Sequence, residues 1–557
     1  MLSDSRLLTP VSNIPQGYQG RSPWLVPAAA ACPQQTPGAV ATNPLSVIAS
    51  NGLLRADFVF RTFVDVYGLR HYCYIYGDNV QAPTLRIYPG DELVLRLRNE
   101  LPPPGDLSAP GERPFPHAHS MEIAGPCGVG RLSASSTNLH FHGMHISPGC
   151  HQDDVISTLV EPSGEWYEYR FKIPKDQPPG LYWYHPHPHG FSEAQVLGGA
   201  SGALIVEGTE RANPKVAGLG ERVLVLRDQI VPGLTEALED AGPGKDISLN
   251  FVPVMDPIYR PAIIEGRSGQ REFWRVLNAS ADTYFDLQLR AGTAEAPSIP
   301  YPQKLEVVAL DGVPSPSAML THVVTHVVTH VLIPPGGRAE FLVTMPPQTV
   351  FAQLVTQRYD TGPDGESTPY RVIANIESNP DGPLAASMMP GVPRGLVTPP
   401  APPAAAALAG LKPARRRKLY FSETHQDPKD RTSLASYYIT VAGQTPKAFD
   451  MNFKKPNITA KQGTVEDWVV ENRANEAHAF HIHQLHFQVL ERDGKATGDP
   501  SLRDTIDLPF WDGKSAYPSV KLRMDFRSPA IAGTFLYHCH ILEHEDGGMM
   551  GVIRIKP

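Results

Sequence analysis

Histidines are the residues of this 557-residue chain whose spacing most clearly points to chemistry. Four short motifs, TNLHFHGMH, WYHPHPHG, HAFHIHQLH and YHCHILEH, each contain a His-x-His pair. Residues i and i+2 of a β-strand point to the same side, so each pair would aim two imidazoles at one place. Imidazole is a ligand for copper, zinc and iron, and eight of them could hold three metal ions.

A second metal site is predicted behind the last of these pairs. Cys539 lies between two of the histidines, so on a strand its side chain points to the opposite face. His544 and Met549 follow it, and His478 precedes the third pair. Two histidines, one thiolate and a weak axial methionine form the ligand set of a blue-copper electron-transfer site. Because zinc does not transfer electrons, the pattern favours redox copper, with one peptide segment joining the two sites.

The elements that must position these residues are predicted to be strands. The segment LRIYPGDELVLRLRNEL alternates apolar and polar residues after a Pro-Gly-Asp turn, and 57 prolines and 47 glycines favour many turns. Such patterns recur in three blocks, which predicts an all-β protein of three sandwiches. The predicted ranges are an extended arm at 1–50, domains at 51–212, 213–378 and 415–557, and a Pro/Ala-rich linker at 379–414.

The overall composition excludes several classes of partner. The chain is 41% hydrophobic and 19% charged, with a formal net charge of −8, which argues against nucleic acid as a partner. No apolar run is long enough for a membrane span, so we expect no membrane insertion, and a monomer is the default. The segment MLSDSRLLTPVSNIPQG lacks the features of a secretory signal. We therefore expect a cytoplasmic or spore-coat-like location, or a periplasmic or extracellular one if a leader has been removed.

Taken together, HFHG, WYHPHPHG, HAFHIH and HCHILEHEDGGMM resemble the four copper-binding motifs of the multicopper oxidases. The resemblance covers residues from about 55 to 557, and around HCHILEHED it is closest to bacterial laccases, including spore-coat laccases. It implies three Greek-key cupredoxin-like domains, with a type 1 copper in the third and a trinuclear cluster between the first and third. Ala479 stands where many relatives have proline, which we expect to alter only the local turn.

The resemblance also implies ligands for four copper ions. The type 1 ligands would be His478, Cys539, His544 and Met549. The type 2 ligands would be His140 and His481. The type 3 pair would be held by His142, His185, His187, His483, His538 and His540.

Reduction of O2 to water also needs protons, and family members place acidic residues after the first and last motifs. Glu545, next to His544, resembles the second of these acids. Asp153 or Asp154 would fill the first role, with a slight preference for Asp153. The alternative for each is a solvated carboxylate or a local turn cap.

The implied activity is that of a laccase, which oxidises small reducing substrates such as phenols and aromatic amines one electron at a time and reduces O2 to water. A metallo-oxidase acting on Cu(I) or Fe(II) is the first alternative, although no methionine cluster exceeds Met388-Met389. A copper-free structural or cell-division protein on the same scaffold is the second, and the complete ligand set argues against it. The chain length and the four His-x-His pairs disfavour a two-domain nitrite reductase.

The remaining cysteines and histidines leave alternatives open. Cys32, Cys73, Cys127 and Cys150 could form two disulfides in any of three pairings, which we favour only if the protein is exported, or stay as four buried thiols. The repeat containing His322, His326 and His330 could be a surface metal site, but a slipped duplication is the favoured reading. Packing or contacts to ligands are expected for the three histidines nearest the motifs, which are His145, His189 and His486. No role is assigned to His71, His117, His119, His151 and His425.

Overall fold

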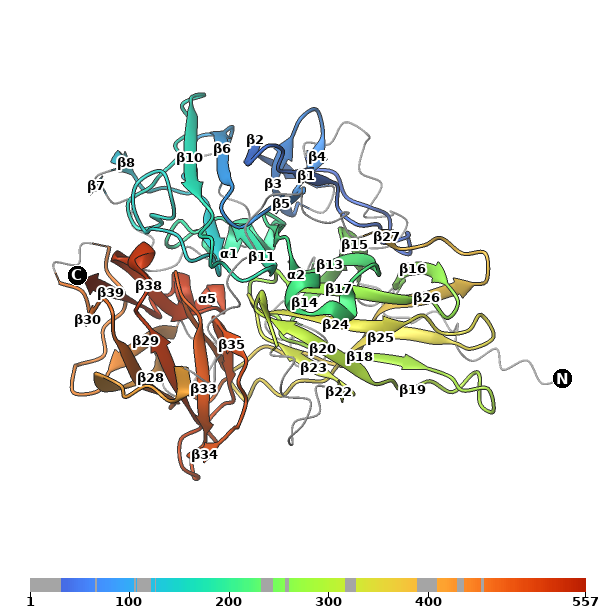
Figure 1. Ribbon diagram of the computed structural model, residues 1–557. Helices are drawn as coiled ribbons and strands as arrows, with labels where there is room; N and C mark the ends of the chain where they lie inside the picture. The colour runs from blue at the N-terminus through green and yellow to red at the C-terminus, as the bar shows by residue number, and fades with distance from the viewer. Residues whose placement is uncertain are drawn as a thin grey trace.

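The regular structure of the chain consists almost entirely of β-strands, which confirms the all-β prediction. The computed structural model describes residues 32–65, 68–104, 107, 122–125, 127–231, 244–255, 260–315, 327–387, 408–427, 435–451 and 455–557. Figure 1 shows three β-rich lobes, coloured blue to cyan, green to yellow, and orange to red along the chain. Each lobe contains two large sheets, and we name them the first, second and third sheet pairs.

The first sheet pair carries the first two histidine motifs. One sheet has the order β1 (Ser46–Ile48), β5 (Thr84–Ile87), β12 (Gly202–Val206), β11 (Gly180–His185) and β9 (His140–His142). The other has the order β10 (Trp166–Lys172), β6 (Glu92–Asn99), β2 (Leu53–Val64), β3 (Arg70–Tyr76) and β4 (Val80–Gln81). A small hairpin is formed by β7 (Glu122–Gly125) and β8 (Gly128–Arg131). Strand β9 lies at the edge of its sheet, so its histidines can meet another part of the molecule.

The second sheet pair contains no His-x-His motif. Its larger sheet runs through β15 (Val252–Val254), β14 (Lys245–Leu249), β13 (Gly220–Ile230), β17 (Arg271–Asn278), β24 (Arg338–Thr344), β20 (Leu305–Leu310) and β21 (Val313–Pro314), with β22 (Val327–Val328) and β27 (Ala386–Ser387) attached. The other sheet runs through β16 (Ala262–Arg267), β26 (Arg371–Asn379), β25 (Ala352–Gln357), β18 (Phe285–Ala291) and β19 (Tyr301–Pro302), with β23 (Val331–Ile333) on β18.

The third sheet pair carries the last two motifs. One sheet runs through β29 (Ala435–Val441), β28 (Arg415–His425), β31 (Val465–Asn472), β37 (Ser519–Asp525), β33 (Phe487–Arg492) and β34 (Lys495–Ala496), with β35 (Leu502–Arg503) on β33. The other runs through β30 (Ile458–Lys461), β39 (Met550–Lys556), β38 (Gly533–Cys539), β32 (His478–Ile482) and β36 (Thr505–Leu508). Because β32 and β38 are neighbours, the third and fourth motifs lie side by side.

Each sheet pair encloses its own apolar core, as expected of a sandwich. Fully buried tryptophans mark two of these cores, Trp274 in the second pair and Trp468 in the third. A smaller cluster joins Leu181 and Trp183 of the first pair to Val223 and Leu277 of the second, so the lobes pack against each other through apolar contacts.

Two short strands lie outside the ranges predicted for the domains. β1, within the predicted arm, pairs in parallel with β5, and β27, within the predicted linker, pairs with β13. Segments of two or three residues are too short for their periodicity to stand out from a Pro/Ala-rich background. The described part of the arm is extended, and Asn43 hydrogen-bonds to the backbone of Glu221 and Val223, so it ties the first two sheet pairs together.

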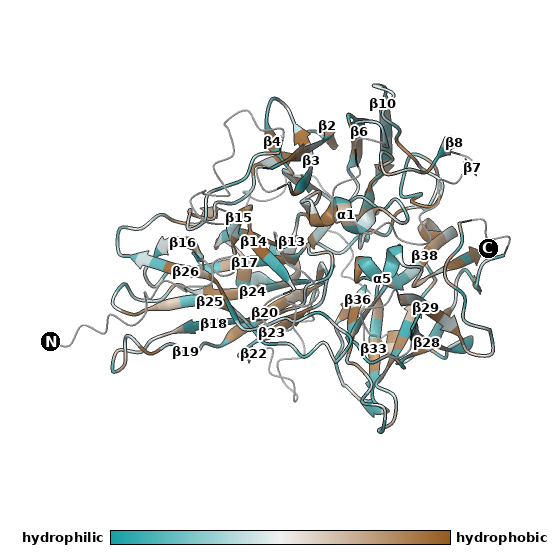
Figure 2. Ribbon diagram, turned by 180° about the vertical axis from the view of Figure 1, so that it is seen from behind, coloured by the Kyte–Doolittle hydropathy of each residue, from teal (hydrophilic) through white to brown (hydrophobic). Residues whose placement is uncertain are grey.

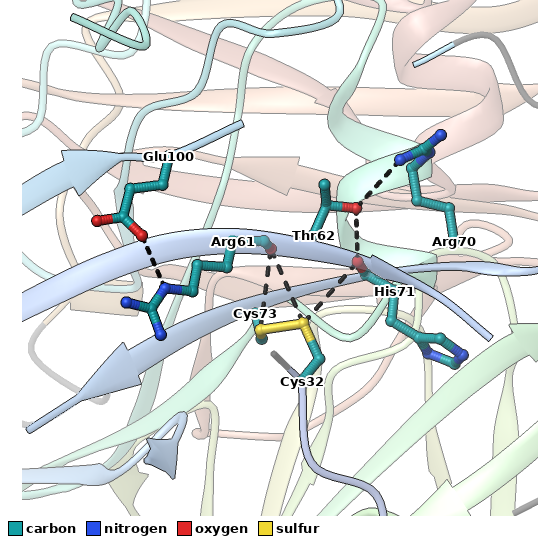
Figure 3. The surroundings of a disulfide bond; sticks show 7 residues. All are labelled: Cys32, Arg61, Thr62, Arg70, His71, Cys73 and Glu100. Atoms are coloured by element: carbon teal, nitrogen blue, oxygen red, sulfur yellow. Dashed lines mark hydrogen bonds and ion pairs between the residues drawn. A yellow bond between two sulfur atoms is a disulfide. The ribbon is translucent and has the colours of Figure 1, made fainter. Parts of the chain in front are cut away.

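Four of the cysteines form two disulfides, which resolves the alternatives left open by the sequence. Cys32 pairs with Cys73, and Cys127 pairs with Cys150. Figure 3 shows the first of these bonds, which fastens the segment before β1 to β3. Cys539 is the free cysteine, and it is buried.

The helices among the described residues are short. They include α1 (Ser192–Leu197), α2 (Thr209–Ala212), α5 (Leu542–Asp546) and the 3-10 turns η4 (Pro214–Val216) and η6 (Pro529–Ile531). Figure 2 colours α5 as hydrophilic, yet His544, Glu545 and Asp546 of this helix are buried. Buried polar side chains require partners or a function, so α5 marks a region of interest. Within the described part of the chain, no helix is long and apolar enough to cross a membrane.

Candidate metal centre

Strand register brings the first two motifs together. β9 pairs antiparallel with β11, and this places His140 opposite His185 and His142 opposite Trp183. His187 is the second residue after the end of β11. Because β9 is an edge strand, its two histidines and those of β11 are presented toward the neighbouring third sheet pair.

The last two motifs are arranged in the same way. β32 pairs antiparallel with β38, with His481 opposite His538 and Phe480 opposite Cys539. His483 and His540 lie one residue beyond the ends of these strands. The alternation of the strands puts the predicted cluster histidines on one side and Cys539 on the other, as the sequence predicted.

The eight histidines of the four pairs meet between the first and third sheet pairs, and we call them the histidine cluster. The rings of His140 and His483 stack with centroids 3.9 Å apart, and those of His142 and His481 stack at the same distance. The Nε2 atoms of His483 and His538 are 3.1 Å apart. All eight side chains are at most 1% exposed.

The protonation of these rings suits metal binding. Burial is the largest cause that lowers the pKa of the cluster histidines, and the neighbouring imidazoles lower it further. Neutral imidazole is the form that binds a metal. Several ring nitrogens are buried without a hydrogen-bond partner. They are His140 Nε2, His142 Nδ1, His185 Nε2, His481 Nε2, His483 Nδ1 and both nitrogens of His540.

Unpartnered buried nitrogens are costly unless something binds them, so the donor set fits a group of metal ions. His187, His483 and His538 form one set of nitrogens within 4.8 Å of each other, and His140 belongs to two further sets. Imidazole-only sets of this kind suit copper. The cluster therefore has the donors for the three copper ions predicted from the sequence.

Two carboxylates contact cluster histidines at the ring nitrogen opposite the unpartnered one. Asp153 lies 3.0 Å from His140 Nδ1 and accepts hydrogen bonds from the backbone of Phe141 and from the side chain of Gln484. Asp504, which the sequence did not single out, lies 3.0 Å from His142 Nε2. Burial raises the pKa of Asp504, and the Arg338 guanidinium opposes this rise.

Of the three predicted acids, two lie beside the cluster. Glu545 is fully buried, with carboxylate oxygens 3.4 Å from His187 Nδ1 and 3.3 Å from His538 Nδ1. Burial raises the pKa of Glu545 well above its usual value, and Asp546 raises it further. Asp154, in contrast, accepts hydrogen bonds from Ser157 and the backbone of Ile156, away from the histidines. The structure thus separates Asp153 from Asp154, which the sequence could not do.

The second predicted site lies in the third sheet pair, and we call it the thiolate site. Cys539 Sγ lies 3.6 Å from His478 Nδ1 and 3.7 Å from His544 Nδ1, and these two nitrogens are 3.1 Å apart. A triangle of one sulfur and two nitrogens matches the trigonal ligand set of blue copper. Met549 is fully buried in the same apolar core as Cys539, and its carbonyl accepts a hydrogen bond from the Cys539 backbone N–H.

The outer side of the thiolate site is lined by an aromatic ring and two carboxylates that the sequence did not reveal. Tyr437 stacks on the His544 ring with centroids 4.3 Å apart. Glu476 Oε1 lies 2.9 Å from His544 Nε2. Burial raises the pKa of the nearby Glu423 to about 9, and its contact with Glu476 adds to this rise. Glu476 stands two residues before His478 but outside β32, and it contacts His544 instead, so no strand spacing in the sequence pointed to it.

The other described histidines belong to neither the histidine cluster nor the thiolate site. His145 and His486 form a contact of 2.6 Å with each other, and His189 packs against Phe449, as expected for residues near the ligands. His71 pairs with Asp65. His330 pairs with Asp286 on the surface. The predictions for His117, His119, His322, His326, Met388 and Met389 lie outside the described residues.

Fold and site together define a cupredoxin-type β-sandwich protein with a thiolate site and a histidine cluster. Multicopper oxidase family models match residues 131–211 and 419–557, which include all four histidine motifs. The two parts of the chain that carry the motifs are multicopper oxidase domains, as the motifs predicted. Members of this family are copper-dependent oxidoreductases that use O2 and reducing substrates.

Individual relatives are distant but cover most of the chain. A multicopper oxidase of Staphylococcus epidermidis is 24% identical, over 86% of this chain and 83% of its own length. The cell division protein FtsP of Xenorhabdus nematophila is 23% identical, over 90% of this chain and 88% of its own. The solved structure of a Campylobacter jejuni multicopper oxidase, described as a metallo-oxidase, has a TM-score of 0.63 with 23% identity and covers 95% of this chain and 96% of its own. The last comparison shows the shared fold.

Proposed function

We propose that this protein is an oxidase of the laccase type. It takes electrons one at a time from phenols or aromatic amines and uses them to reduce O2 to water. The observation that carries the proposal is the connection between the two sites, since Cys539 of the thiolate site is covalently flanked by His538 and His540 of the histidine cluster. Bound copper would supply the one-electron redox chemistry at both places.

We assign one copper ion to the thiolate site and three to the histidine cluster. His478, Cys539, His544 and Met549 would hold the type 1 ion. His140 and His481 would hold the type 2 ion. His142, His185, His187, His483, His538 and His540 would hold the type 3 pair. The unpartnered nitrogens of the cluster support this assignment.

Side chains at the two sites would assist the transfer of electrons and protons. His544, which contacts Glu476 through Nε2 and stacks on Tyr437, would be the type 1 ligand nearest to a bound substrate. Glu476 can accept a hydrogen bond from a phenol hydroxyl or an aromatic amine there. Glu545, buried between His187 and His538, can hold a proton and release it toward the cluster. Asp153 orients His140 from behind.

The test is a steady-state survey on fully copper-loaded protein. We expect about four copper ions per chain, a blue absorption band, and O2 consumption driven by phenols and aromatic amines. A copper-free structural or cell-division protein on the same scaffold would show none of these. Clearly fewer than four ions per chain, or turnover without a blue band, would refute the proposal.

A second candidate function is oxidation of Fe(II) or Cu(I), and the carboxylates beside His544 favour it. Glu476 is 6% exposed, lies 2.9 Å from His544 Nε2 and is next to Glu423. A cation bound there would be close to the His544 ring, and the carboxylates would offset its charge. A metallo-oxidase is also how the Campylobacter jejuni neighbour is described.

The two candidates differ in the substrate that gives the higher kcat/KM. A metallo-oxidase would prefer Fe(II) or Cu(I) over phenols, and its KM for the cation would rise with ionic strength because attraction to carboxylates is screened. A laccase would prefer phenols, with little dependence on salt.

We further propose that the protein works in an oxidising compartment, periplasmic or extracellular. The two disulfides support this, because such bonds are rare where thiols are kept reduced. Thiol counting by mass spectrometry on protein from its native host tests it. One free thiol, Cys539, is expected, and five would contradict the proposal.

A further inference from the structure

The second sheet pair, which has no histidine motif, is connected to two histidines of the cluster by way of an arginine. Arg338, the first residue of β24, is 1% exposed. Its NH1 and NH2 groups donate hydrogen bonds of 2.7 and 2.6 Å to the two carboxylate oxygens of Asp504. Asp504 immediately precedes β36 of the third sheet pair. This bidentate ion pair therefore joins two lobes of the molecule directly behind the cluster.

Asp504 contacts two cluster histidines at once. Its carboxylate oxygen Oδ1 lies 3.0 Å from His142 Nε2. Its backbone carbonyl accepts a hydrogen bond of 2.9 Å from His481 Nδ1. His142 comes from the first sheet pair and His481 from the third, so Asp504 links ligands that belong to different lobes.

These contacts determine which nitrogen of each ring is left for a metal. A carboxylate and a carbonyl are acceptors, so His142 Nε2 and His481 Nδ1 must carry the protons. The opposite nitrogens, His142 Nδ1 and His481 Nε2, are then unprotonated, and both are buried without a partner. A second hydrogen bond of this kind fixes the tautomer and orientation of a metal-bound histidine.

Arg338 itself has little freedom to move. Besides Asp504, it donates hydrogen bonds to the carbonyls of Leu181, Gly336 and Asp311. The Asp311 carboxylate accepts a hydrogen bond from the Arg338 backbone N–H and lies 3.3 Å from the backbone nitrogens of Asp504 and Thr505. The second sheet pair thus holds both the side chain and the backbone at residue 504.

We propose that Arg338 is a positioning residue for the metal centre, which acts through Asp504 to fix the metal-binding nitrogens of His142 and His481. The middle lobe then contributes to the cluster without supplying a ligand. The proposal rests on the proposed function, since it concerns the copper ions that these two histidines would bind. Arg338 touches no ligand, so its effect must appear as a change in how copper is held.

The test compares copper content and the electron paramagnetic resonance spectrum of the wild type and two variants, R338K and D504N. A lysine keeps the positive charge but cannot donate the paired hydrogen bonds. We expect copper affinity at the cluster to fall about 10- to 100-fold, with an altered type 2 signal. The blue absorption of the thiolate site should stay unchanged, because Arg338 makes no contact with it.

R275K is the matched control. Arg275 is also fully buried and paired with carboxylates of the second sheet pair, Glu221 and Glu340, but the described structure gives it no contact with Asp504. If R338K lowers stability as R275K does and leaves copper content and the type 2 signal intact, Arg338 is merely structural and the proposal is overturned. Should R338K fail to fold, D504N carries the same test, because the amide replaces the charge without changing the shape.

Failure of the proposed function and failure of the positioning role would give different results in these measurements. Wild-type protein that loads no copper at the cluster would remove the basis for both proposals. Wild-type protein that loads fully, with an unaltered spectrum in R338K and D504N, would overturn the positioning role alone.

Discussion

The thiolate site and the histidine cluster are built in different ways from the same few strands. Every residue of the thiolate site comes from β32, β38 and the segment that follows β38, all within the third sheet pair. The cluster takes four histidines from the first pair and four from the third, and Asp504, which contacts two of them, is held by Arg338 of the second. The first site is therefore local to one lobe, whereas the second exists only where three lobes meet.

This difference implies different sensitivities to mutation. A change inside the third lobe can remove the thiolate site and leave the cluster, because the two groups face opposite sides of β38. A change at the junction of the lobes can disturb the cluster and leave the thiolate site. The following variants test this independence, in order of the expected effect.

The variant C539S should break the thiolate site alone and have the largest effect. A serine hydroxyl does not replace a thiolate as a ligand for blue copper, so the blue band should disappear. Copper content should fall to about three ions per chain, and turnover should drop to the level of copper-free protein. Metal analysis, absorption and O2 consumption measure these changes. Y537F, which changes another buried residue of β38, should behave as the wild type. Retained turnover in C539S would rule out the thiolate site as the route for electrons.

The variant E545Q should affect the cluster and spare the thiolate site. Glu545 lies within 3.4 Å of His187 and His538 and has no competing ion-pair partner among the described residues. Loss of a positioned acid typically costs about 100-fold or more in rate, so kcat for O2 reduction should fall by about that factor. Rapid mixing should show normal reduction of the blue band by substrate. The control is E543Q on the same helix, and a wild-type kcat in E545Q would contradict a role in proton delivery.

The variant E476Q should affect substrate binding at the thiolate site and spare the cluster. If the carboxylate binds a cation, its removal should raise KM for Fe(II) about tenfold, which corresponds to about 1.4 kcal/mol. KM for a neutral phenol should change much less, because an amide still accepts a hydrogen bond. E491Q, on the surface at β33, serves as control. Equal changes for both substrates would argue against a cation site.

The smallest effect on activity is expected from E423Q, which should instead change the dependence of stability on pH. The pKa of Glu423 is raised from 4.5 to about 9 in the folded protein, so between these values the folded state binds one more proton than the unfolded state. Its stabilising contribution is therefore complete below pH 4.5 and is lost as the pH rises through about 9. The slope is at most about 1.4 kcal/mol per pH unit.

Denaturant unfolding of the copper-free protein at several pH values measures this slope. E423Q should show a shallower decline than the wild type across the same range. Parallel curves for the two proteins would mean that Glu423 is ionised in the folded state at neutral pH.

The site residues that could be predicted from the sequence are those that lie in, or next to, one short motif. The eight cluster histidines and Cys539 could be found because a strand repeats every two residues, and the structure brings all of them together. Copper binding by these residues stays a prediction. Glu545 was accessible because it adjoins a motif, whereas Asp153 and Asp154 could be told apart only by their contacts.

Arg338 and Asp504 were not accessible from the sequence. They are 166 residues apart and belong to different lobes, and neither lies in a pattern of regular spacing. Glu423 and Glu476 were not accessible from the sequence either, because only the packing of the third lobe around His544 brings them close to this ligand.

The sequence by itself determined the all-β class, the four histidine pairs and the opposite orientation of Cys539. Each of these depends on residues close together in the chain, where the geometry of a single strand is enough. Only the tertiary structure decided which sheet edges meet, which carboxylates stand behind the imidazoles and which cysteines pair. Those relations arise from the packing of distant strands, and packing depends on the whole set of buried surfaces rather than on any local pattern.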